Sequence, residues 1–208
     1  MNQSPAAPAR HAPATARNRD PILAAIAPIL PARGLLLEIS SGTGEHAAFM
    51  APRLPPGLLW QPSDLDPASL ADIDAHARAS GCDRIQAAVV LDAMSAHWPV
   101  RCADAILCCN MIHIAPWVAS EGLFAGAART LPRDAPLILY GPFRRDGEHT
   151  APSNAAFDDS LRQRNACWGV RCLDTEVTPL AQRNGFCRDA VLQLPANNLL
   201  VVFRRNAA

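Results

Sequence analysis

The feature that most constrains this chain is an alternation of short apolar runs with amphipathic segments, repeated through most of its length. The runs are strand-length and almost wholly apolar, which is typical of strands buried on both faces. They are Leu35 to Ile39, Leu58 to Trp60, Ile85 to Leu91, Ala103 to Ile112 and Leu137 to Tyr140. Because parallel strands are joined by crossover helices, the pattern predicts an α/β protein with a mostly parallel sheet covered by helices on both faces.

Helices are predicted between these strands. One begins near Gly44, and another spans Pro67 to Ser80, with Asp66 as its N-cap and Gly81 as its stop. A third is predicted over Val118 to Leu131.

The last fifth of the chain departs from this rhythm. Two apolar runs, Ala190 to Leu194 and Leu199 to Phe203, are separated only by the turn-forming residues Pro195 to Asn198. Strands this close in sequence form an antiparallel hairpin. With the five earlier strands, the hairpin completes a Rossmann-like, doubly wound sheet of seven strands.

The amino-terminal segment is rich in alanine, proline and arginine and has no periodic apolar face. We expect residues 1–17 to form a disordered arm and residues 18–208 to form a single domain, since 208 residues suit one compact core. Order is expected to begin at Asp20 and Pro21, an N-cap acid followed by proline at the first helical position.

Composition excludes several classes of protein. All 19 basic residues are arginine and are balanced by 19 acids, which argues against a nucleic-acid or general polyanion binder. No apolar run approaches the ~18–20 residues of a membrane helix, so no membrane association is expected.

The seven cysteines form no CxxC unit, and two of them, Cys108 and Cys109, fall in an apolar run. Cysteine there behaves as a small apolar residue, which favours a reducing, cytoplasmic location. The absence of ligand spacing predicts no metal site.

The residues best suited to chemistry follow the first strand. The segment from Glu38 to His46 is a strand end, a glycine turn and a helix start in succession. Gly42 and Gly44 allow close approach of a ligand to the backbone, and the helix start offers free N–H groups. Glu38 would face a hydroxyl or ammonium group rather than a phosphate, which it would repel.

Two further carboxylates follow the next two predicted strands. Asp64 stands where an acid can accept hydrogen bonds from both hydroxyls of a ribose. Asp92 could accept from an adenine amino group or could equally cap a turn. Gly42 to Ala47 also fits a dinucleotide fingerprint, so a nicotinamide cofactor remains an alternative.

This combination resembles the class I S-adenosylmethionine-dependent methyltransferases over roughly residues 20 to 205. The family's acid and glycine turn correspond to Glu38 to Gly44, with Ser40 in place of the first glycine. Asp64 and Asp92 match its ribose and adenine acids. The runs Asn18 to Leu23, Asn110 to Trp117, Tyr140 to Phe143 and Pro195 to Leu199 look like a methyltransferase-like branch long described as a domain of unknown function.

The resemblance implies an S-adenosyl-L-methionine cofactor and a methyltransferase acting on a small-molecule acceptor. The implied cofactor contacts are Glu38, Ser40, Gly42, Gly44, Asp64, Leu65, Asp92, Ala93 and Asn110.

His113 and Tyr140, at the ends of the fourth and fifth strands, are the candidate catalytic residues for an acceptor that needs deprotonation. Residues 141–184 are expected to roof the acceptor site, where Arg144 and Arg145 could recognise an acidic acceptor or simply be solvated. A cofactor-binding protein without turnover and, less favoured, a nicotinamide-dependent oxidoreductase remain alternatives. The sequence does not reveal the oligomeric state.

Overall fold

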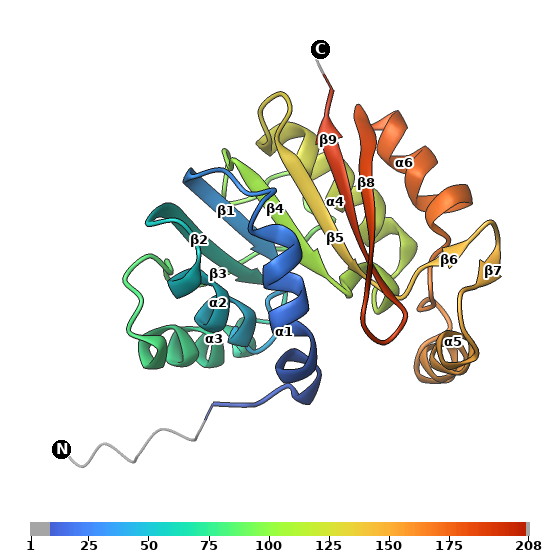
Figure 1. The fold of residues 1–208 in the computed structure, drawn as a ribbon, viewed down its shortest axis with the longest axis horizontal. Helices are drawn as coiled ribbons and strands as arrows, with labels where there is room; N and C mark the ends of the chain where they lie inside the picture. Colours follow the sequence, from blue (N-terminus) through green and yellow to red (C-terminus); the bar gives the residue numbers. More distant parts are fainter. Residues whose placement is uncertain (1–8, 207–208) are drawn as a thin grey trace.

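The computed structural model describes residues 9–206, and its centre is a seven-stranded sheet in the order β3-β2-β1-β4-β5-β9-β8 (Figure 1). The sheet consists of β1 (Arg33–Ile39), β2 (Gly57–Asp64), β3 (Val89–Val90), β4 (Ala105–Cys109), β5 (Pro136–Gly141), β8 (Phe186–Leu194) and β9 (Asn198–Arg205). Strands β1 to β5 pair in parallel, whereas β9 is antiparallel to both β5 and β8. The predicted α/β, Rossmann-like sheet with a closing hairpin is therefore confirmed.

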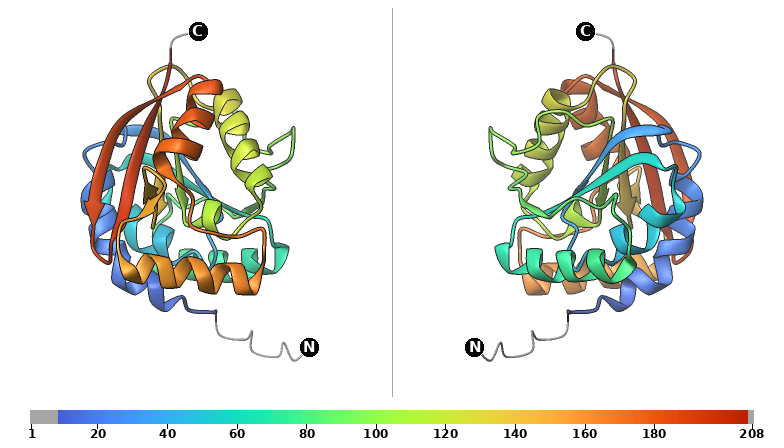
Figure 2. Two further views of the ribbon diagram at one scale, coloured as in Figure 1. Left: turned by 90° about the vertical axis from the view of Figure 1, so that its right-hand side faces the viewer. Right: turned by 90° about the vertical axis from the view of Figure 1, so that its left-hand side faces the viewer.

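Helices cover both faces of the sheet (Figure 2). They are α1 (Pro13–Ile26), α2 (Glu45–Met50), α3 (Pro67–Ser80), α4 (Trp117–Thr130), α5 (Pro152–Arg164) and α6 (Thr178–Arg183). Shorter turns are 3-10 at Ala51–Arg53 and Met111–His113 and π-helical at Leu173–Val177.

The alternation of side chains along each strand creates two apolar cores, one on each face. In β5, Leu137 and Leu139 pack in the core that contains α4 and α6. Ile138 and Tyr140 lie in the opposite core, with α1 and α2. Both sets are fully buried or nearly so, which explains why the strand sequences are apolar on both faces.

Helix α3 begins and ends where its sequence predicts. The Asp66 side chain accepts a hydrogen bond from the Ala68 N–H at 2.9 Å, and Gly81 adopts the left-handed conformation, with φ of 68°. In the hairpin, Ala196 and Asn197 both have positive φ, so the turn is of the kind that matches the twist of the two strands.

The start of α1 differs from the expectation. The helix begins at Pro13 rather than after Asp20, and it continues through Pro21. Pro13 occupies the first helical position, where a missing N–H costs nothing, and Asn18 within the added turns bonds to His46 of α2. Residues 13–17 are thus helical; residues 1–8 of the predicted arm lie outside the described residues, and the boundary of the domain at residue 18 stays a prediction.

The third strand is also shorter than its apolar run. Val89 and Val90 alone form β3, whereas Ile85 makes only an isolated bridge to Trp60. Between them the Gln61 side chain donates to the Ala87 carbonyl at 2.8 Å, so a side chain replaces the backbone ladder at this sheet edge.

The segment after β5 contains a small separate hairpin of β6 (Arg144–Arg145) and β7 (Glu148–His149). Within residues 9–206, no helix has the length and apolar character needed to cross a bilayer. All seven cysteines are free.

A substitution at Gly126 tests how closely α4 packs against Trp98. A Cβ at this position would overlap the Trp98 indole. We expect Gly126→Ala to lower the free energy of unfolding by about 1–3 kcal/mol in urea titration, because overpacking outweighs the better helix propensity of alanine. The exposed Glu121→Ala on the same helix is the control. A gain in stability for Gly126→Ala would contradict the close packing of α4 on Trp98.

Candidate functional site

The loop between β1 and α2 is built from residues in the left-handed conformation. Ser40, Gly42 and Gly44 have φ of 60°, 61° and 81°. A Cβ on Gly42 would meet nothing within 4 Å, so a ligand can approach the backbone there. A Cβ on Gly44 would lie 2.7 Å from the Ile73 Cα, so Gly44 is required for packing against α3.

Asp64, at the end of β2, is joined to this loop. Its Oδ2 accepts the Gly42 N–H at 2.9 Å, and its Oδ1 accepts the Asp66 N–H at 3.0 Å. The structure thus brings together two of the predicted site residues, and it orients the carboxylate of one against the backbone of the other. Each carboxylate oxygen retains a second lone pair for a further donor.

Glu38 lies beneath the loop rather than at its surface. The side chain is almost fully buried, and Oε2 accepts hydrogen bonds from Ser41 Oγ at 2.8 Å and Trp60 Nε1 at 3.0 Å. His46 Nδ1 lies 3.8 Å from Oε1. These contacts hold the turn against β2, and direct contact of Glu38 with a ligand stays a prediction.

The segment around Asp92 follows β3 at the same edge of the sheet. We call this edge, formed by the Gly42 loop, Asp64 and the Asp92 segment, the rim. Asp92 Oδ1 accepts the Met94 N–H at 2.8 Å, so Asp92 caps a turn, as one of its two predicted roles requires. Ala93, between these two residues, is buried. Leu65 and Met94 follow β2 and β3 and are unusually exposed for apolar side chains, at 57% and 45%. The rim therefore combines carboxylates with apolar side chains that are open to a flat apolar group.

A cavity of about 660 Å³ opens at the neighbouring ends of β4 and β5. It is lined from four parts of the chain: Arg17 and Asn18 of α1, Asn110 and Tyr140 at the strand ends, Asn154 and Phe157 of α5, and the hairpin turn at residues 195–198. The backbone N–H of Asn110 donates to the Tyr140 carbonyl at 2.8 Å, which holds the ends of β4 and β5 together.

The sequence predicted Asn110 as a cofactor contact and Tyr140 as a catalytic residue, and both line this cavity. It also predicted that residues 141–184, which include α5, cover an acceptor site. It did not identify Arg17 as a lining residue because Arg17 fell within the predicted arm. No local signal in the sequence places the hairpin turn beside α1 and α5.

Asn18 connects the cavity to the loop. Its Oδ1 lies 2.9 Å from His46 Nε2, and its side chain also contacts the Tyr140 hydroxyl. Burial raises the pKa of Tyr140, and Asn18 only partly opposes that effect. The Tyr140 hydroxyl therefore stays protonated near neutral pH and can donate a hydrogen bond.

His113 is fully buried and does not line the cavity. Its Nδ1 accepts the Arg171 N–H at 3.2 Å, and its ring packs edge-on against Phe143. Burial, assisted by the Arg171 charge, lowers the pKa of His113 to about 3. Nε2 has no hydrogen-bond partner among the described residues and faces Gly141. This arrangement anchors the segment around Arg171, and a catalytic role for His113 stays a prediction.

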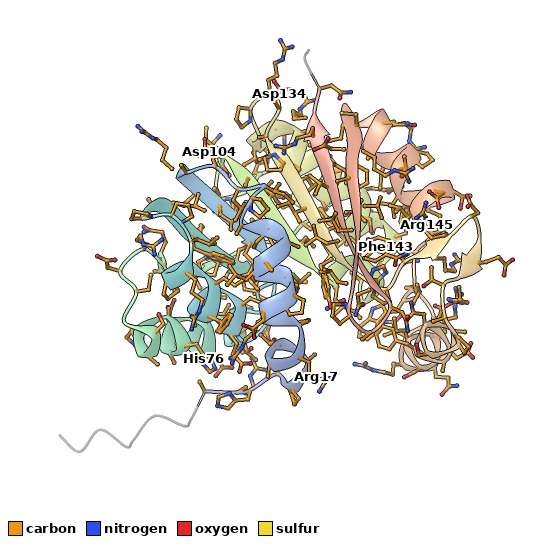
Figure 3. The ribbon with its side chains drawn as sticks, in the orientation of Figure 1. Arg17, His76, Asp104, Asp134, Phe143 and Arg145 are labelled. Atoms are coloured by element: carbon orange, nitrogen blue, oxygen red, sulfur yellow. The ribbon has the colours of Figure 1, made fainter. Side chains whose placement is uncertain are left out.

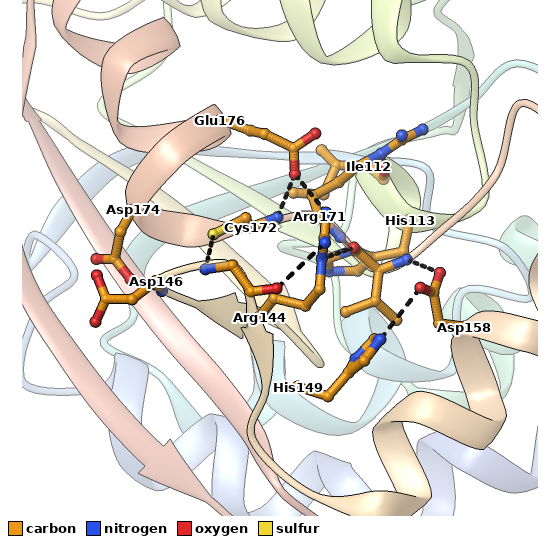
Figure 4. Close-up of polar contacts among 12 residues, drawn as sticks. Ile112, His113, Arg144, Asp146, His149, Asp158, Arg171, Cys172, Asp174 and Glu176 are labelled. Carbon is orange, nitrogen blue, oxygen red and sulfur yellow. Dashed lines mark hydrogen bonds and ion pairs between the residues drawn. The ribbon is translucent and has the colours of Figure 1, made fainter.

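Arg144 and Arg145 form ion pairs and do not line the cavity; Figure 4 shows Arg144 near Glu176. Arg144 lies 3.1 Å from Glu176, and Arg145 lies 2.7 Å from Asp174. Figure 3 shows Arg145 on the small hairpin of β6 and β7, while Arg17 extends from the first turns of α1. Both arginines are thus engaged with acids of the same region, and recognition of an acidic acceptor by either of them stays a prediction.

Glu38 gives the site a dependence on pH. Burial, assisted by the Asp64 charge, raises the pKa of Glu38 from 4.5 to about 7, although the bonds from Ser41 and Trp60 oppose the rise. Because the folded state holds this proton more tightly than the unfolded state, Glu38 stabilises the fold most at low pH, and that stability is lost as pH rises through about 7.

We expect Glu38→Gln, which keeps an acceptor for Ser41 and Trp60, to remove this loss. The difference in melting temperature, variant minus wild type, should therefore increase as the pH is raised from about 5 to about 8. The lowered pKa of His113, which is not in contact with Glu38, affects both proteins alike and cancels in the difference. Glu121→Gln is the exposed control, and a difference that is flat with pH would contradict the buried position of Glu38.

Comparison of the fold with solved structures identifies the architecture. An O-methyltransferase family protein from Burkholderia thailandensis matches with a TM-score of 0.78 and 16% identity, covering 94% of this chain and 58% of that one. CalO1, a methyltransferase in calicheamicin biosynthesis solved in an SAH-bound form, matches with a TM-score of 0.74 and 18% identity, covering 92% and 54%. YcgJ from Bacillus subtilis matches with a TM-score of 0.70 and 13% identity, covering 93% and 100%.

At these identities the likeness establishes the fold, and the chain spans little more than half the length of the first two structures. The sequence itself matches a family that is described as "Protein of unknown function (DUF938)", over residues 9–205. Since the match extends over nearly the whole chain, this protein belongs to the DUF938 family.

Proposed function

We propose that this protein is an S-adenosyl-L-methionine-dependent methyltransferase that acts on a small-molecule acceptor. One observation carries the proposal: the open Gly42 loop, bonded to Asp64, follows β1, while Asn110 and Tyr140, which line the cavity, follow or end the adjacent strands β4 and β5. The register of the sheet places the ends of β1 and β4 side by side, since Ile39 pairs with Cys108. A nucleoside on the rim and a second molecule in the cavity would therefore be neighbours.

The residues at the rim fit such a cofactor. We assign the ribose hydroxyls to Asp64 and the adenine to the exposed Leu65 and Met94, with Asp92 as acceptor for its amino group. The open backbone at Gly42 suits the amino acid portion, beside Ser40 and Asn110. Ala93 supports the turn from inside, and Gly44 and Glu38 act by shaping the loop.

When bound, S-adenosyl-L-methionine supplies a methyl group activated by a sulfonium. The chain's own contribution is to position the acceptor and to exclude water, which can account for much of the acceleration of such a displacement. The apolar Phe157 and Pro142 in the cavity wall reduce hydration, and Tyr140 orients the acceptor by a hydrogen bond. Tyr140 lines the cavity, and its raised pKa keeps the hydroxyl protonated near neutral pH, so it is suited to donate a hydrogen bond rather than to accept a proton.

The principal alternative is a protein that binds the cofactor or its demethylated product without turnover. The chemistry has no obligatory catalytic side chain, so the same rim serves either function. The antiparallel β9 and the likeness to structures described as methyltransferases favour a methyl donor over a nicotinamide. A cytoplasmic location and an absence of membrane or nucleic-acid partners complete the proposal.

The decisive experiment is turnover across a panel of small-molecule acceptors, following formation of S-adenosylhomocysteine. Turnover of one acceptor class would support the proposal. Tight binding of S-adenosyl-L-methionine with no product from any acceptor would favour the non-catalytic alternative, and binding of NAD alone would contradict both.

Asp64→Asn tests the ribose assignment. Loss of the charged acceptor should weaken binding of S-adenosylhomocysteine by about 1–3 kcal/mol in calorimetry. Asp83→Asn, which changes an exposed acid elsewhere, should bind as wild type does. Wild-type affinity in a folded Asp64→Asn protein would refute the assignment.

Tyr140→Phe tests the orientation of the acceptor. We expect turnover to fall by less than the ~10²–10⁴-fold typical of a lost base, with cofactor affinity within a few-fold of wild type. Single-turnover rates and cofactor dissociation constants separate the possibilities. Unchanged turnover would remove Tyr140 from the site, and a large loss of cofactor affinity would make it part of the cofactor wall.

A further inference from the structure

The segment that precedes α1 is attached to the two helices behind the glycine loop. The backbone N–H of Arg10 donates to Asp72 of α3 at 3.1 Å, and its guanidinium pairs with the same carboxylate. The Ala12 N–H donates to Glu45 Oε2, at the start of α2, at 2.6 Å. Residues 10–12, which we call the strap, therefore span α2 and α3.

Two imidazoles and a carboxylate converge where the strap crosses. His11 comes from the strap, Glu45 from α2 and His76 from α3. One ring nitrogen of each histidine and a carboxylate oxygen of Glu45 all lie within 4.8 Å of one another. His11 Nδ1 lies 3.0 Å from Glu45 Oε1, and the two rings meet edge to face with centroids 5.1 Å apart. Figure 3 shows His76 close to the point where the chain enters α1.

We propose that His11, Glu45 and His76 form a Zn²⁺ site. Two imidazoles and one carboxylate are a ligand set that zinc takes in proteins, and a water molecule would complete a four-coordinate arrangement. The set contains no thiolate and is not composed of oxygens alone, so it disfavours Cu⁺ and Mg²⁺. In a tetrahedral site with Zn–ligand bonds of about 2.0 Å, neighbouring ligand atoms lie ~3.3 Å apart. The ligand atoms here lie within 4.8 Å of one another, so they would move closer together when Zn²⁺ binds.

The surroundings of the cluster suit a cation. Glu45 and Asp72 each bring a negative charge, whereas Arg10 brings one positive charge and directs it to Asp72. Glu45 Oε2 accepts hydrogen bonds from the Ala12 N–H at 2.6 Å and the Thr43 hydroxyl at 2.8 Å, and Oε1 lies 3.0 Å from His11 Nδ1. The Glu45 carboxylate is thus already oriented by groups around it, as metal-bound carboxylates are.

The His11 side chain is 75% exposed, so solvent and ions reach the cluster directly. The His76 Nε2 lies 2.8 Å from the Arg10 carbonyl, which fixes the ring by one nitrogen and leaves the other for a metal. A bound ion would tie the strap to both helices. Because Glu45 follows Gly44 directly, the ion would also hold the loop at the proposed cofactor rim.

Calorimetric titration of ZnCl₂ into the full chain, without a polyhistidine tag and after chelator treatment, tests the proposal. We expect one strong site per chain and a rise in melting temperature with Zn²⁺. His76→Ala and Glu45→Gln should each lower the affinity for Zn²⁺ by more than ~10–100-fold. Loss of a residue that only hydrogen-bonds to a metal ligand already costs that much, and these residues are the proposed ligands themselves. Mg²⁺ should give neither heat nor stabilisation.

His97→Ala, which removes an exposed histidine elsewhere, is the matched control and should bind Zn²⁺ as wild type does. The absorption spectrum with Co²⁺ in place of Zn²⁺ shows whether the metal binds this site or the exposed cysteines. Nitrogen and oxygen ligands give visible bands only, whereas cysteine ligands add thiolate charge-transfer bands. Absence of a strong site, equal binding by His76→Ala, or thiolate bands with Co²⁺ would overturn the proposal. None of these measurements uses S-adenosyl-L-methionine or an acceptor, so failure here is distinct from failure of the proposed function.

Discussion

The arrangement of the whole rim depends on one buried carboxylate. Glu38 receives hydrogen bonds from Ser41 in the loop and from Trp60 in β2, and so it joins β1, β2 and the turn between β1 and α2. Without these donors the carboxylate would carry the full cost of burial. Once the turn is held, the Gly42 N–H reaches Asp64, and the backbone of Gly42 is left open to a ligand. Glu38 thus shapes the loop from beneath, whereas its direct contact with a ligand stays a prediction.

Helix α1 extends this organisation to the cavity. Asn18 lies between His46, which faces Glu38, and Tyr140, which faces the cavity. Polar contacts therefore run from beneath the cofactor rim to the acceptor side through a helix from the amino-terminal part of the chain. The strap precedes the same helix and contacts α2 and α3, so both ends of the proposed cofactor rim depend on residues that lie before the first strand.

The cavity has the character of a small-molecule site. Amide side chains, one tyrosine and one arginine line it together with proline and phenylalanine, and no carboxylate among residues 9–206 contributes to its wall. Its parts come from α1, the ends of β4 and β5, α5 and the hairpin turn, so the fold brings together segments that are distant in the chain. If the proposed function holds, these segments select the acceptor, while the sheet and the glycine loop belong to the shared fold.

Local signals in the sequence determined the elements. The N-cap Asp66 and the stop at Gly81 bound α3 as predicted, because both act within one helical turn. Apolar runs located the strands but not their ends: β2 continues past Trp60 to Asp64, and β4 ends at Cys109, before Asn110, rather than at Ile112. The tertiary structure alone decided the rest. Helix α1 begins before its apolar face does, Glu38 is buried by β2, and His11, Glu45 and His76 meet although 34 residues separate the first two. These features depend on which distant segments pack together, and neither periodicity nor capping encodes that choice.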